Sequence, residues 1–152
     1  MAATRQARAV WSGDLAKGSG EVSSVTSGKF SSLPVSWGAR TEAPQGKTSP
    51  EELLAAAHAS CFSMALSADL AKAGTPPKRL EVTSTVTFDK VGDKWTVVSS
   101  ALEVTGDVPG IDAAAFAKAA EGAKDGCPIS RALTNNVKLS VKSTLRSEAG
   151  VR

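Results

Sequence analysis

The feature that most constrains this chain is a long apolar segment with a clear helix start. Ser49 can act as N-cap, Pro50 fits the first helical position, and Glu52 stands three residues after the cap, where a capping box places an acid. The pattern predicts a helix that continues to about Lys72, because Gly74 follows where helices often end. The rest of the fold has to pack around this helix.

Apolar side chains occupy nearly every face of the predicted helix. They are Leu53, Leu54, Ala55, Ala56, Ala57, Ala59, Phe62, Met64, Ala65 and Leu66. A helix of this kind has to be buried on every side, and a chain of 152 residues rarely encloses it alone. We therefore expect a second copy of the chain to cover one face of this long buried central helix, in an intertwined homodimer with two-fold symmetry.

Shorter elements precede and follow the long helix. They are a three-stranded meander over residues 8–37, a loop over 38–48, a hairpin of strands 79–90 and 95–105, helices over 112–124 and 128–133, and a last strand over 136–146. This order, βββ-α-ββ-α-α-β, groups strands on either side of helices. It indicates an α+β fold with antiparallel sheets, formed as a single domain over residues 1–152.

Composition narrows the class of protein. A net charge of +3, with 22% charged and 41% hydrophobic residues, is ordinary for a soluble globular chain. The basic residues are scattered and are not interleaved with aromatic ones, which argues against a nucleic-acid partner. The longest apolar run, over residues 53–66, is shorter than the ~20 residues that a bilayer span needs, and no signal-peptide pattern is recognised at the start. We expect a cytoplasmic protein with no membrane association.

The two cysteines are the first candidates for chemistry. In a reducing compartment a thiol pair is more often catalytic, redox-sensing or metal-binding than structural. Cys61 falls in the middle of the long helix, where by itself it is most simply a small core residue. Cys127 is expected at the start of a short helix, where the positive end of the helix dipole favours a reactive thiolate.

His58, the only histidine, stands three residues before Cys61 on a neighbouring helical face. The residues alone leave several interpretations open. His58 can be a base for Cys61 in an acyl-transfer enzyme, a zinc ligand with Cys61 and Cys127, although no CxxC spacing supports that, or an imidazole satisfied by hydrogen bonds. A non-enzymatic dimeric binding module, in which the thiols form a redox switch, is a further alternative.

Two segments together resemble a known family. SPEELLAAAHASCFSMALS, residues 49–67, and GCPISRAL, residues 126–133, are similar to the OsmC/Ohr family of thiol-dependent peroxidases, and the first segment is closer to the OsmC branch. The resemblance extends from the early ARAVWSGDLAKGSG and VTSGKF segments to the last strand. It implies an OsmC-like fold, an organic hydroperoxide as substrate, and no metal or bound organic cofactor.

The resemblance also implies the roles of particular residues. Cys61 would be the peroxidatic thiol, which becomes a sulfenic acid, and Cys127 the resolving thiol, which joins it in an intramolecular disulfide; this reverses the argument from the helix dipole. A dithiol, either small or carried by a lipoyl-bearing protein, would reduce the disulfide. Arg40 would stabilise the Cys61 thiolate while Glu51 holds its guanidinium in a bidentate pair. Thr41 follows Arg40 where many relatives have an aromatic residue.

The spacing of these residues suggests how a site is assembled. Glu51 and Cys61 are ten positions apart on one helix, about 15 Å along its axis, so direct contact within one chain is not expected. Antiparallel packing of two central helices would bring Glu51 of the partner subunit toward Cys61. We therefore expect two composite sites at the dimer interface. A preference for hydrophobic peroxides is expected as well, with candidate pocket walls at Phe62, Met64 and Trp37.

Overall fold

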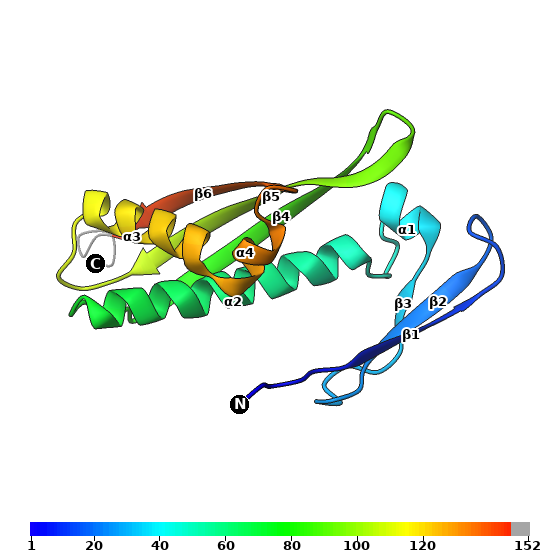
Figure 1. Cartoon of the computed structure of the whole chain (residues 1–152), viewed down its shortest axis with the longest axis horizontal. Coiled ribbons are helices and arrows are strands. Elements are labelled where there is room, and N and C mark those ends of the chain that lie inside the picture. Colours follow the sequence, from blue (N-terminus) through cyan, green and yellow to red (C-terminus); the bar gives the residue numbers. More distant parts are fainter. Residues whose placement is uncertain (147–152) are drawn as a thin grey trace. The chain divides into compact units, whose positions relative to one another are not determined.

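The structure, a computed structural model, describes residues 1–146, which form two compact units that divide between Leu53 and Leu54. The elements in chain order are β1 (Ala7–Ser12), β2 (Ser19–Ser24), β3 (Leu33–Val35), α1 (Trp37–Thr41), α2 (Pro50–Lys72), β4 (Arg79–Val91), β5 (Lys94–Asp107), α3 (Ala113–Gly126), α4 (Pro128–Leu133) and β6 (Lys138–Leu145) (Figure 1). The α+β class expected from the sequence is confirmed, and the long helix ends at Lys72 as predicted.

The first unit contains the predicted three-stranded meander, in the order β1-β2-β3 with antiparallel pairing throughout. Trp11 lies opposite Gly20 in the register, and a Cβ at Gly20 would stand 2.7 Å from Trp11 Cε3. Only glycine therefore lets the indole ring lie against the neighbouring strand. Part of the segment predicted as a loop is instead the short helix α1, because the Ser36 hydroxyl caps it by accepting the Ala39 N–H at 3.1 Å.

The second unit contains a sheet with the order β4-β5-β6. The long hairpin of β4 and β5 turns at Gly92, whose φ of +61° favours glycine. β6 differs from the antiparallel arrangement expected, because it pairs parallel to β5 from Ser99 opposite Lys138 onward. The reason is the crossover formed by α3 and α4. It carries the chain from the end of β5 back toward its beginning, so that β6 runs in the same direction as β5.

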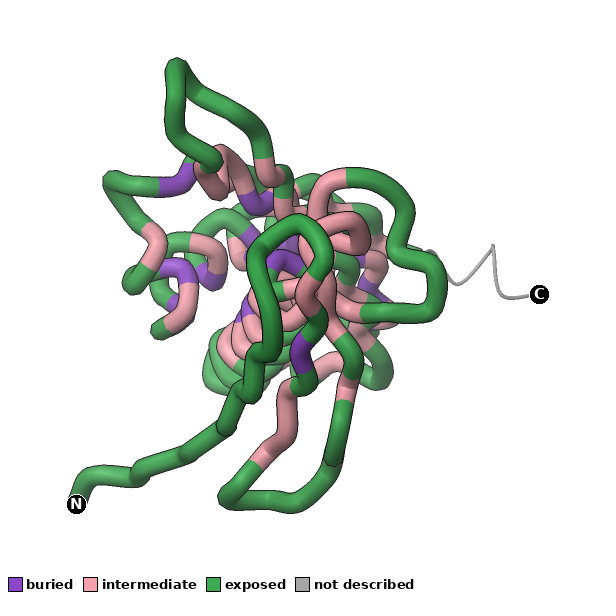
Figure 2. The backbone as a smooth tube through the Cα atoms, turned by 90° about the vertical axis from the view of Figure 1, so that its right-hand side faces the viewer, coloured by how far each residue is buried: buried purple, intermediate pink, exposed green. Residues whose placement is uncertain are grey.

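One cluster of buried apolar side chains joins the helices of this unit to its sheet. Its members are Phe62, Leu66, Leu70, Leu102, Val104, Val108, Phe116, Ala120, Ala123 and Cys127. The first three are spaced four residues apart and therefore share one face of α2. Within the second unit α2 and α3 run alongside the sheet (Figure 1). Along both helices buried positions alternate with partly buried and exposed ones, and the backbone coloured by burial shows buried stretches among partly buried and exposed ones (Figure 2).

The opposite face of α2 is exposed, although the sequence predicts a helix buried on every side. Ala56, Ser60, Met64 and Ala68 follow one another at four-residue spacing and are all exposed, Met64 by 67%. The stripe consists of small or flexible side chains. Below, these four residues are called the exposed stripe of α2.

By length and composition, α2 is the one helix among residues 1–146 that could cross a membrane. The interrupted apolar run over residues 53–66 predicted no span from the sequence. A helix in the core of a soluble protein can be equally long and apolar. Phe62 and Leu66 are fully buried against the sheet of the second unit, and His58 makes buried hydrogen bonds there. These contacts are those of a core helix.

Candidate active site

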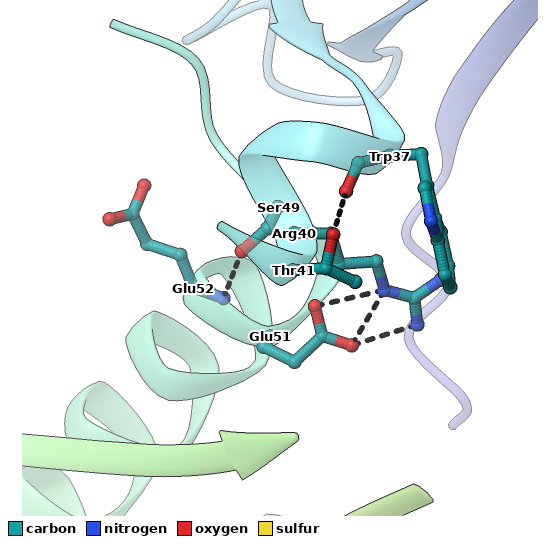
Figure 3. A network of polar contacts seen from close by, with 6 residues as sticks. All are labelled: Trp37, Arg40, Thr41, Ser49, Glu51 and Glu52. Atoms are coloured by element: carbon teal, nitrogen blue, oxygen red, sulfur yellow. Dashed lines mark hydrogen bonds and ion pairs between the residues drawn. The ribbon is translucent and has the colours of Figure 1, made fainter. Parts of the chain in front are cut away.

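The start of α2 determines which of two adjacent acids can serve the site. The Ser49 hydroxyl accepts the Glu52 N–H at 3.1 Å, as expected of the N-cap. The Glu52 carboxylate does not complete the capping box, because it accepts the Thr48 hydroxyl at 2.6 Å instead. Glu51, also in the first turn of α2, points toward Arg40 (Figure 3).

Arg40 and Glu51 form a bidentate ion pair within the first unit. Arg40 Nε donates to Glu51 Oε1 at 3.0 Å and to Oε2 at 3.1 Å, and Arg40 Nη2 donates to Oε1 at 2.8 Å (Figure 3). The Arg40 guanidinium carbon also lies 5.9 Å from the centre of the Trp37 ring, a cation–π distance. The Glu51 side chain is 9% exposed and that of Arg40 31%. The carboxylate therefore fixes the guanidinium plane while part of the arginine stays accessible.

A hollow of about 320 Å³ lies beside this ion pair, in the same unit. Its walls are mostly apolar and include Trp11, Leu15 and Trp37, and Arg40 contributes to its lining. Trp37 therefore lines a hollow, as expected from the sequence. Of the other two expected wall residues, Phe62 is fully buried in the core. Met64, in the exposed stripe of α2, lines a separate hollow of about 520 Å³ in the second unit.

Cys61 and Cys127 are neighbours in the second unit, and both are free thiols. Cys61 is half-buried, whereas Cys127 is fully buried. Burial raises the pKa of the Cys61 thiol, and the adjacent Cys127 thiol raises that pKa further, against the lowering effect of a hydrogen bond from the Ile129 N–H. The arrangement can form a disulfide, while the immediate surroundings of Cys61 on balance disfavour its thiolate.

Backbone N–H groups in the first turn of α4 donate hydrogen bonds to both sulfur atoms. Cys127 is the N-cap of α4, as predicted, and its Sγ accepts the Ser130 N–H at 3.3 Å. The Ile129 N–H from the same turn is the donor to Cys61. The first N–H groups of a helix have no acceptor within the helix, so α4 uses two of them to hold the two sulfurs.

His58 is fully buried between two serine hydroxyls. Its Nδ1 lies 2.6 Å from Ser100 Oγ on β5, and its Nε2 lies 2.8 Å from Ser130 Oγ on α4. Burial lowers the pKa of His58, so the imidazole is neutral near pH 7. The direct Cys61–His58 pair considered from the sequence is not formed, because both ring nitrogens are bonded to serines.

Neither of the two serines was predicted from the sequence as part of the site. Ser130 follows the N-cap Cys127 by three residues, a spacing that predicts its N–H bond to the sulfur but not its side-chain bond to His58. Ser100 is 42 residues from His58, and no local pattern connects them. The zinc site considered from the sequence has no support either, since within residues 1–146 no three His, Cys, Asp or Glu side chains are grouped to hold a metal ion.

Comparisons with known proteins identify the family to which this chain belongs. The model of the family described as OsmC-like protein matches residues 43–142. Peroxiredoxin OsmC of Escherichia coli (strain K12) is 41% identical over 139 residues, which cover 91% of this chain and 96% of the relative, and the same values hold for Peroxiredoxin OsmC of Shigella flexneri. The chain belongs to the OsmC family, as its resemblance implied.

Solved structures agree with the fold. The organic hydroperoxide resistance protein OhrB of Bacillus subtilis has a TM-score of 0.71 at 24% identity, with 93% of this chain and 98% of that chain covered. The organic hydroperoxide resistance protein OsmC of Legionella pneumophila has a TM-score of 0.69 at 22% identity, with 94% and 99% covered. At these identities the likeness supports the OsmC-like fold.

Proposed function

We propose that this thiol-dependent peroxidase reduces organic hydroperoxides to alcohols through Cys61 and Cys127. The observation that carries the proposal is the pair of adjacent free thiols in a chain 41% identical to proteins named Peroxiredoxin OsmC. The Cys61 thiolate attacks one peroxide oxygen, the O–O bond breaks, and the alcohol leaves after taking up a proton. Cys61 is left as a sulfenic acid.

The second half of the cycle uses the neighbouring thiol. Cys127 attacks the sulfur of the Cys61 sulfenic acid, so that a disulfide forms and water is released. A dithiol then reduces the disulfide and is itself oxidised. Its source is a small dithiol or a lipoyl-bearing protein.

Arg40 supplies the charge that Cys61 lacks in its own surroundings. The groups around Cys61 raise the pKa of its thiol on balance, so a cation is needed to hold the thiolate at neutral pH. Arg40, fixed by Glu51, is suited to this task because its fork geometry binds an anionic sulfur and a peroxide oxygen. The apolar hollow beside Arg40 would take the organic group of the peroxide.

We further propose a homodimer in which the exposed stripe of α2 packs against a second copy of the chain. Small residues such as Ala56 and Ala68 allow two helices to approach closely. Antiparallel packing would bring Arg40 and Glu51 of the partner subunit to Cys61, which is ten positions from Glu51 along α2. In this proposal residues 1–152 act as one OsmC-like domain in the cytoplasm.

Turnover with different peroxides tests the proposed activity. With dithiothreitol or dihydrolipoamide, the protein should consume cumene hydroperoxide with a kcat/KM about 10–100-fold above that for hydrogen peroxide, because an organic group that buries about 100 Å² of apolar surface gains roughly 2.5 kcal/mol. The residual peroxide is measured over time. Oxidation of both thiols without turnover would favour the redox-switch alternative, and equal rates for both peroxides would contradict the substrate class.

Mixing two inactive variants tests the composite site. Cys61→Ser subunits keep Arg40, and Arg40→Met subunits keep Cys61, so a mixed dimer has one native site if the residues act across the interface. Subunit exchange should restore about a quarter of native activity, because half of the dimers are mixed and one of their two sites is native. The measurement is peroxide consumption after co-refolding. No restoration in verified mixed dimers would mean that Arg40 acts on Cys61 of its own chain.

A further inference from the structure

A buried chain of hydrogen bonds ends at the sulfur of Cys127. It joins Ser84 Oγ to Ser100 Oγ at 3.0 Å, Ser100 Oγ to His58 Nδ1 at 2.6 Å, His58 Nε2 to Ser130 Oγ at 2.8 Å, and Ser130 Oγ to Cys127 Sγ at 3.2 Å. Ser84, Ser100, His58 and Ser130 lie in β4, β5, α2 and α4, and Cys127 is the N-cap of α4. His58, Ser100, Ser130 and Cys127 are all 0% exposed. The chain therefore connects a buried titratable ring to a reacting atom with no solvent-exposed side chain between them.

The donors and acceptors along these hydrogen bonds can be assigned so that each group donates in the direction leading away from Cys127. A neutral imidazole has one N–H and one lone pair. When Nδ1–H donates to Ser100, Nε2 accepts the Ser130 hydroxyl, and the Ser130 oxygen can accept the S–H of Cys127. In this arrangement the proton of the thiol is separated from a basic nitrogen by one hydroxyl group.

We propose that His58 accepts the thiol proton of Cys127 through the hydroxyl of Ser130 when Cys127 attacks the Cys61 sulfenic acid. The proposal rests on the proposed function and concerns its second step. The S–S bond forms, the S–O bond of the sulfenic acid breaks, and hydroxide leaves with the bonding electron pair. The Cys127 proton passes to Ser130 Oγ as the Ser130 proton passes to His58 Nε2. Hydroxide takes a proton from solvent and His58 later returns one, so thiol and sulfenic acid give disulfide and water.

The surroundings of His58 suit a proton acceptor. Burial lowers the pKa of His58, and among the described residues no charged side chain contributes to that shift. The groups that face its ring nitrogens are the hydroxyls of Ser100 and Ser130, and the titratable groups at the end of the chain are the thiols of Cys127 and Cys61. The imidazole is therefore neutral near pH 7, with a lone pair on one ring nitrogen that can take up a proton.

Two variants interrupt the proposed proton relay, from Cys127 through Ser130 to His58, at different atoms. Ser130→Ala removes the bridging hydroxyl and keeps the backbone N–H that binds Cys127 Sγ. His58→Gln keeps an amide able to hydrogen-bond Ser130 but cannot take up a proton. Ser84→Ala is the matched control, because it removes a serine hydroxyl from the far end of the same chain.

The experiment separates the two steps after one equivalent of cumene hydroperoxide is mixed with reduced protein. Sulfenic acid formation, followed with a dimedone trap, should stay within about twofold of native, while disulfide formation should slow by about 10²-fold in Ser130→Ala and His58→Gln and remain native in Ser84→Ala. In the native protein disulfide formation should be nearly independent of pH between about 6.5 and 8. In the two relay variants it should rise with hydroxide concentration, about tenfold per pH unit, because solvent has to remove the proton.

The possible failures are distinguishable. Native rates of disulfide formation with a flat pH profile in both variants would overturn the relay. Equal slowing of both steps in Ser130→Ala would also overturn it, since that is the signature of a purely structural role. Absence of any sulfenic acid in native protein would instead overturn the proposed function.

Discussion

Cys61→Ser is expected to abolish peroxide consumption, with a loss of about 10⁴-fold or more in kcat, whereas Cys127→Ser should still complete the first oxidation. A serine hydroxyl stays protonated at neutral pH and cannot be oxidised by the peroxide. It therefore cannot take over from the Cys61 sulfur as the group that attacks the peroxide. Cys127→Ser is a matched isosteric change that also supplies a hydroxyl oxygen as N-cap acceptor for α4, in place of the sulfur. The rates are measured by peroxide consumption under single- and multiple-turnover conditions.

The mass of each oxidised variant identifies the intermediate. Native protein should lose about 2 Da on forming the disulfide, and Cys127→Ser should gain about 16 Da as a sulfenic acid. The opposite result, with oxidation retained in Cys61→Ser and lost in Cys127→Ser, would assign the peroxidatic role to Cys127. That is the role the helix-dipole argument alone suggests, so this experiment decides between the dipole and the family resemblance.

Arg40→Met is expected to slow the first oxidation by about 10²–10³-fold, the range found when one preorganised donor to a developing charge is removed. Arg40→Lys should recover only part of this loss, because an ammonium group cannot form the bidentate pair seen with Glu51. Glu51→Gln should give a smaller loss, since the acceptor oxygen remains while its charge is removed. Sulfenic acid formation measured by stopped flow checks all three.

A matched control and the pH profile test the cause of this effect. Glu52→Gln makes the same chemical change one residue away, where the carboxylate accepts the Thr48 hydroxyl and takes no part in the Arg40 ion pair, and should be nearly neutral. Burial raises the pKa of the Cys61 thiol, and Arg40 is the cation proposed to offset that rise. In Arg40→Met the rate of sulfenic acid formation should therefore keep rising with pH above about 8.5, the ordinary pKa of a thiol. The native rate should level off at lower pH. A native pH profile in Arg40→Met would contradict the assigned role.

Local signals predicted the helix starts well. Ser49 and Cys127 were expected at helix starts from residues within four positions, and each side chain accepts an N–H as an N-cap does. The direction of β6 depends instead on the crossover through α3 and α4, which strand periodicity cannot express. No apolar periodicity predicts the short helix α1, and its N-cap, Ser36, resembles the many serines found in loops.

The candidate site was predictable to a different extent. The family resemblance, and not spacing, linked Arg40 to Glu51 and Cys61 to Cys127, and the structure forms the first as an ion pair and the second as neighbouring thiols. The serines around His58 could not be predicted, because Ser100 and Ser130 are 42 and 72 residues from it in the sequence. Tertiary packing alone brings these hydroxyls to the ring.

The unequal burial of the two sulfurs would determine how a reductant opens the proposed disulfide between them. An incoming thiolate has to reach one sulfur in line with the S–S bond, and only Cys61 is partly exposed, while Cys127 is fully buried. In the proposed cycle the reductant would therefore form its mixed disulfide with Cys61, and Cys127 would depart as the leaving group toward the Ser130 N–H. One accessible sulfur would thus meet the oxidant and the reductant in turn, and the other would never leave the interior.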